Sequence, residues 1–80
     1  MTVRAYILVQ AEVGTAADVA VAVSGLDNIV SADVAMGPYD VIAQAEASDV
    51  NHLGRIVITD VQKLPGVERT LLCPVVTVDA

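Results

Sequence analysis

The residues with the most distinctive properties lie next to one another in one segment, Gly37-Pro38-Tyr39-Asp40. It combines a flexible glycine, a rigid proline, one of only two aromatic residues and a carboxylate. The Gly-Pro pair indicates a turn, and the alternating segment that follows places Asp40 at the start of a strand. A carboxylate there either receives an ammonium group at a subunit boundary or simply caps the turn.

The other candidates for chemistry lack partners. His52 and Asp49 lie three residues apart near the start of an expected helix, but a general base needs further placed groups. We interpret them as solvated residues on the outer helix face. Cys73 sits in an apolar strand with no neighbouring cation, as a small hydrophobic residue would. The acidic residues show no spacing typical of a cation-binding loop, so we expect no catalytic residue, no metal site and no cofactor.

The charge of the chain argues against two classes of partner. The net charge is −6, and only Arg4, Arg55, Lys63 and Arg69 are positive. Nucleic-acid binding draws much of its affinity from cationic contacts to phosphate, and anionic membranes select for the same contacts. We therefore expect neither a nucleic acid nor a membrane as a direct partner. No apolar run is long enough for a signal or transmembrane segment, and the lone cysteine fits a reducing compartment, so we expect a cytoplasmic protein.

The apolar content predicts self-association. Residues 1–80 are enough for a single domain with a small core. Yet 55% of them are hydrophobic, which is above the roughly 45–50% of ordinary domains. Surplus apolar surface is most simply buried against a second copy. We therefore expect a homo-oligomer.

The apolar spacing also indicates the elements that position these residues. Apolar and polar residues alternate in four segments and recur every three or four positions in two others. The sequence thus predicts two successive strand–helix–strand units. The expected strands are Val3–Val13, Ile29–Met36, Asp40–Ala47 and Val67–Val78, and the expected helices are Thr15–Leu26 and Ser48–Leu64.

This βαββαβ order predicts an α+β fold of ferredoxin-like type, a four-stranded antiparallel sheet with two helices on one face. Thr15 and Asp18 resemble a capping box at the first helix, and Ser48 or Asp49 is expected to cap the second. The uncovered sheet face is expected to carry Tyr6, Leu8, Ile42, Gln44, Thr70 and Leu72. Such a half-apolar face favours packing against a second subunit, although an antiparallel sheet can also stay solvated on one side.

Three short motifs, in order and at matching spacing, carry a resemblance to a known family. Ala5–Val9 resembles an opening strand, Met36–Asp40 a Gly-x-Tyr-Asp turn, and Leu64–Thr70 a Leu/Ile-Pro-Gly-Val-x-x-Thr stretch. Together they resemble the effector-binding domain of Lrp/AsnC-type transcription regulators. The resemblance runs from about Val3 to Val76.

This resemblance implies a dimer formed through the sheets, of the dimeric α/β-barrel type, with dimers commonly assembling into a ring of four. It also implies that small effectors, often amino acids, bind between dimers, with the α-ammonium group near Asp40. The residues that would line this pocket are Gly37, Tyr39, Asp40 and Thr70. The last strand departs from the family pattern, with Leu72 in place of a second Thr and with Pro74.

The family regulators carry an N-terminal helix-turn-helix domain, whereas this chain starts at the first sandwich strand. We therefore expect a stand-alone module that senses an amino acid and modulates transcription or amino-acid metabolism indirectly, without binding DNA itself. One route is co-assembly with a full-length Lrp/AsnC-type regulator. Two alternatives stay open: a dimeric α+β barrel enzyme that uses His52 or Tyr6, and a ligand-free structural oligomerisation domain.

Overall fold

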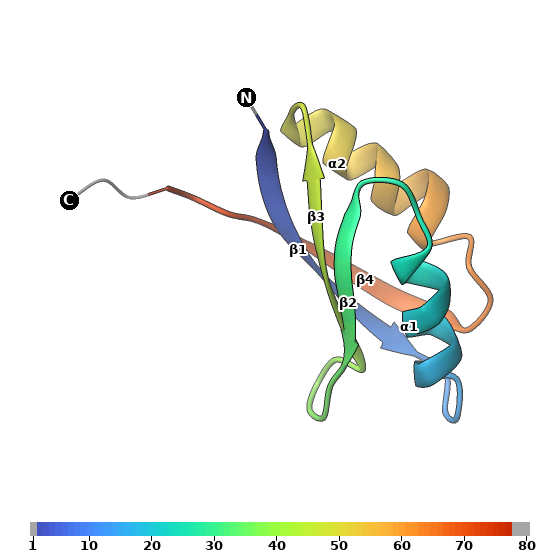
Figure 1. Cartoon of the computed structure of the whole chain (residues 1–80). Helices are drawn as coiled ribbons and strands as arrows, with labels where there is room; N and C mark the ends of the chain where they lie inside the picture. The colour runs from blue at the N-terminus through green and yellow to red at the C-terminus, as the bar shows by residue number, and fades with distance from the viewer. Residues whose placement is uncertain (1, 78–80) are drawn as a thin grey trace.

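Four strands and two helices follow one another in the predicted order, and a short π-helical segment, η1, continues the second helix (Figure 1). The computed structural model describes residues 2–77. Val78, the predicted end of the last strand, lies outside the described residues. The strands are β1 (Val3–Ala11), β2 (Ile29–Val34), β3 (Val41–Ala47) and β4 (Val67–Pro74), and the helical segments are α1 (Ala16–Ser24), α2 (Val50–Ile56) and η1 (Val57–Val61).

The sheet has the strand order β2-β3-β1-β4, and every neighbouring pair runs antiparallel. Both helices lie on the same face of this sheet (Figure 1), so the predicted ferredoxin-like α+β sandwich is confirmed. The register Val9↔Val41 and Ala11↔Val67 brings three connections to one end of the sheet. These are the segments 12–15, 35–40 and 62–66, and we call this the turn end.

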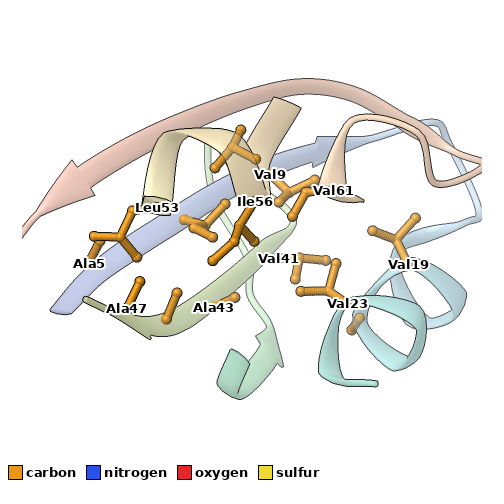
Figure 2. Close-up of a cluster of buried hydrophobic side chains, with 14 residues drawn as sticks. Ala5, Val9, Val19, Val23, Val41, Ala43, Ala47, Leu53, Ile56 and Val61 are labelled. Atoms are coloured by element: carbon orange, nitrogen blue, oxygen red, sulfur yellow. The ribbon is translucent and has the colours of Figure 1, made fainter. Parts of the chain in front are cut away.

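The core is purely aliphatic and lies between the sheet and the helices (Figure 2). Strands β1 and β3 bury every second residue, which is the predicted alternation. The alanines of β3 are small, and Leu53 and Ile56 of α2 pack above them. The buried residues are Ala5, Ile7, Val9, Val19, Ala20, Val23, Val41, Ala43, Ala45, Ala47, Leu53, Ile56, Val57 and Val61.

The two helices begin in different ways. Asp49 caps α2 as expected, because the backbone N–H of His52 donates to its Oδ1 at 2.7 Å. The capping box expected at Thr15 and Asp18 is wrong. The Thr15 hydroxyl instead donates to the carbonyl of Glu12 at 2.7 Å, which closes the turn before the helix.

Strand β4 presents the opposite faces from those predicted. Its ladder with β1 passes from Ala11↔Val67 to Gln10↔Arg69, so Glu68 is an extra residue in a β-bulge. One extra residue reverses which side chains face the core. Thr70 and Leu72, expected on the uncovered face, therefore pair with the buried Val9 and Ile7 and point toward the helices. The uncovered face receives Arg69, Leu71 and Cys73 instead.

A π-helical turn ends the second helix. The N–H of Gln62 donates to the carbonyl of Val57, five residues earlier, at 2.9 Å. This wider turn redirects the residues that follow α2. Among residues 2–77, no helix is long and apolar enough to cross a membrane.

Candidate effector-binding site

Asp40 is anchored at the end of the central strand β1. Its side-chain Oδ2 accepts a hydrogen bond from the N–H of Ala11 at 2.8 Å, and its own N–H donates to the carbonyl of Val9 at 2.9 Å. Its carbonyl accepts from the N–H of Ala35 at 2.8 Å, which closes the turn. The carboxylate therefore positions the turn, and Oδ1 takes no hydrogen bond within the described part of the chain.

The rest of the turn is held toward the uncovered side of the sheet. Gln10 lies on that side, since it alternates with the core residue Val9, and its Nε2 donates to the carbonyl of Pro38 at 3.0 Å. Gly37 has φ of +142°, a conformation that residues with a Cβ rarely adopt. Tyr39 is half-buried beside Asp40. The turn thus offers a backbone cradle, an aromatic ring and a carboxylate within four residues.

Thr70 is separated from this turn by β1. It pairs with Val9 on the β4 side, whereas Asp40 bonds to the same residue on the β3 side. Two strand spacings put roughly 10 Å between their backbones. Thr70 also points toward the helices, and its hydroxyl accepts from Nε2 of Gln62 at 2.9 Å. One protomer therefore brings Gly37, Tyr39 and Asp40 together but does not place Thr70 beside them.

Two hollows on the surface of the protomer lie elsewhere. They measure about 490 and 430 Å³ and share Asn28 and His52 in their walls. Both lie by the α1–β2 connection and α2, and one reaches Ala47 at the end of β3. The seven residues of β3 separate that end from Asp40 by roughly 20 Å. A shallow hollow alone does not make a site, so the turn-end residues stay the candidates.

The residues considered for catalysis are dispersed. The Asp49 carboxylate caps α2 through the backbone of His52. Cys73 lies on the uncovered sheet face opposite Tyr6 in β1, on the other side of the sheet from the helix that carries His52. The sequence missed Gln10, Ala11 and Gln62 as partners of the site. Alternation in β1 could have found Gln10, but no local signal marks the π turn that aims Gln62.

These features define a class: a small ferredoxin-like domain with a Gly-x-Tyr-Asp turn locked onto its central strand. The model of the Lrp/AsnC ligand binding domain matches residues 4–77. The chain belongs to this family, which is a regulatory ligand-binding domain found in transcription regulators. The resemblance inferred from the three motifs is thus confirmed. No match was found among curated protein sequences.

Solved structures agree with the fold. TTHA0845 from Thermus thermophilus has a TM-score of 0.89 at 24% identity, with 98% of each chain covered. AsnC of E. coli gives 0.86 at 15% identity over 98% of this chain and 53% of AsnC. The transcriptional regulator NMB0573 of Neisseria meningitidis, in complex with L-Met, gives 0.81 at 22% over 94% of this chain and 50% of the regulator. The chain thus spans about half of these two regulators, and at such identities the likeness shows the fold alone.

Proposed function

We propose that this chain is an amino-acid sensor whose binding site is completed between protomers. The observation that carries the proposal is the anchored turn with Gly37, Tyr39 and Asp40 at one end of the sheet. Asp40 keeps Oδ1 available for an ammonium group, and Gly37 exposes backbone groups suited to a carboxylate. The neighbouring N. meningitidis regulator was solved with L-Met, which supports an amino acid as the ligand class.

The separation of Thr70 from this turn supports a shared site. Since β1 lies between them within one protomer, we propose that one protomer contributes the turn and another contributes Thr70. A ligand bound by two protomers stabilises the assembled form, because only that form binds it well. Binding would then be read out as a change in assembly, and the protein would act as a sensor and not as an enzyme.

The distribution of exposed apolar residues supports a two-step assembly. The uncovered sheet face carries Tyr6, Leu8, Ile42 and Leu71, which suits a dimer packed sheet against sheet. Two further residues at the turn end, Val13 and Met36, are fully exposed. We propose that they belong to the contact between dimers, in a ring that commonly holds four in this family. With net charge −6, we further propose that the domain does not bind DNA itself.

The test is light scattering coupled to size exclusion, with and without each of the twenty amino acids. We expect one class of amino acid to shift the mass from dimer to a larger assembly. In Asp40→Asn the amide oxygen still accepts from Ala11, so the turn persists while the charge that meets the ammonium group is gone. We expect an affinity at least about tenfold weaker.

Asp40→Ala is the matched comparison, because it loses both the charge and the acceptor for the N–H of Ala11. Its free energy of unfolding, measured in urea, should also be lower than that of the wild type by about 1 kcal/mol. An unchanged mass under every condition would refute the assembly switch. An Asn variant that responds like the wild type would refute the contact between Asp40 and the ammonium group.

A further inference from the structure

A hydrogen bond between two side chains determines what Thr70 can recognise. Nε2 of Gln62 donates to Oγ1 of Thr70 at 2.9 Å, across the gap between η1 and β4. Gln62 is exposed and Thr70 half-buried. The pair therefore lies at the surface, where a second molecule can reach it.

The position of Gln62 depends on the π turn. Its N–H bonds to Val57, five residues back, and not to Ile58, as it would in an α-helix. Such turns are rare and frequently occur at functional sites. The turn rotates Gln62 toward β4, and the bulge at Glu68 rotates Thr70 toward η1. Two independent irregularities, one in a helix and one in a strand, thus converge on one contact.

The contact occupies one of the acceptor positions of the hydroxyl group. A threonine hydroxyl has one proton and two acceptor lone pairs. While it accepts from the Gln62 amide, its own proton stays free to point outward. No hydrogen bond of residues 2–77 uses this proton, so the hydroxyl can donate to an acceptor on a ligand.

We propose that Gln62 is a specificity-determining residue of the effector site, because it orients the Thr70 hydroxyl to donate to an acceptor on the side chain of the amino-acid effector. This inference rests on the proposed function, in which Asp40 and the Gly37 turn hold the α-ammonium and α-carboxylate groups. The favoured effectors are amino acids whose side chains end in an oxygen acceptor. Side chains that end in an ammonium or a methyl group are disfavoured.

The probes are L-glutamine, L-glutamate, L-lysine and L-methionine, of which methionine has nearly the shape of glutamine but lacks a strong acceptor. Affinity is read from the ligand concentration that shifts the assembly mass and, independently, by calorimetry. The wild type should prefer glutamine or glutamate over methionine by about tenfold, the typical effect of one hydrogen bond. A wild type that prefers methionine or lysine would overturn the proposal.

Gln62→Glu reverses the hydrogen bond, since a carboxylate can only accept. Thr70 must then donate to it, and its free lone pairs face the ligand. We expect the preference for glutamine and glutamate to be lost, while Thr70→Val loses it by removing the hydroxyl. Gln62→Lys keeps a donor and should keep the preference. An unchanged preference in Gln62→Glu would mean that the amide oxygen faces Thr70, and would overturn the proposal.

A readout without ligand separates this inference from the proposed function. The side-chain amide protons of Gln62 should shift in the NMR spectrum of the Thr70→Val variant relative to the wild type. If they do not shift, the hydrogen bond is absent and the proposed role of Gln62 in specificity is refuted. If they shift while calorimetry detects no binding of any of the twenty amino acids, the proposed function is refuted and the specificity role with it. If they shift and another amino acid binds while glutamine and glutamate do not, only the specificity role is refuted.

Discussion

At the scale of single residues, Gly66 joins two turns that are far apart in the sequence. Its φ is +90°, and its carbonyl accepts from the N–H of Glu12 at 2.7 Å. A Cβ added there would lie 2.8 Å from the Thr15 hydroxyl and 3.1 Å from a methyl carbon of Val19. The family motif that contains Gly66 therefore has a packing reason here, independent of any ligand.

This geometry predicts the effect of Gly66→Ala. The left-handed backbone costs a residue with a Cβ about 1–2 kcal/mol, and the close contacts with α1 add strain of about 1–3 kcal/mol. Gly14→Ala is the matched control, because Gly14 has φ of +84° but, in the described part of the chain, no atom within 4 Å of the added Cβ. We expect Gly66→Ala to lower the free energy of unfolding about twice as much as Gly14→Ala, measured in urea at equal protomer concentration. Equal losses of unfolding free energy in the two variants would show that α1 moves to accommodate the added methyl group without further loss of stability.

The site residues show which features of the site could be predicted from residue types alone. The turn and the carboxylate of Asp40 could be predicted because Gly, Pro and Asp each have strong local preferences. Its partner could not, because the N–H of Ala11 is a backbone group that carries no side-chain signal. Likewise, Thr70 could be assigned to the last strand, but its neighbour Gln62 depends on a π turn that apolar spacing does not indicate.

At the scale of elements, prediction succeeded where the ladder is regular. Strands β1 and β3 pair without interruption, and their alternation gave the correct core face. It failed in β4, since the bulge at Glu68 exchanges the faces of every later residue. The bulge also explains Leu72. A second threonine would face the core there, whereas leucine packs against it.

The second helix leaves its first apolar residue outside the core. Its buried face begins at Leu53, and Val50 stays half exposed. Val50, Gly54 and Ile58 follow one another at four-residue spacing along α2 and η1, and a Cβ on Gly54 would have no atom of residues 2–77 within 4 Å. The glycine weakens the helix, and no contact with the described residues requires it.

We therefore expect Gly54→Ala to raise the free energy of unfolding by about 1 kcal/mol in urea, from helix propensity alone. Gly54→Leu has nearly the same propensity and should give a similar gain if this face meets only solvent. If another copy packs closely there, the leucine would instead lower the assembly mass while the alanine does not. The pair thus separates an intrinsic helix effect from an interface.

At the scale of the whole molecule, the two faces of the sheet differ in what covers them. One is closed by the helices (Figure 1), and the other presents a row formed by Leu71, Leu8 and Ile42 across β4, β1 and β3. Tyr6 and Cys73 flank this row on the next register position. A contiguous apolar surface is typical of a protein–protein interaction site, so we expect a second copy to pack here. Two-fold packing of such faces would bury the thiol and the row together.

Leu71→Glu tests this arrangement. Leu71 is 46% exposed, so the protomer itself tolerates the change, but a two-fold interface would receive two unpaired charges. We expect light scattering to show a shift toward monomer and Cys73 to react faster with a maleimide. Val21→Glu is the control on the outer side of α1, where the side chain is 72% exposed; it should change neither the mass nor the thiol reactivity. A monomeric Val21→Glu beside a dimeric Leu71→Glu would place the dimer contact on the helix layer, and the uncovered face would then be a solvated sheet.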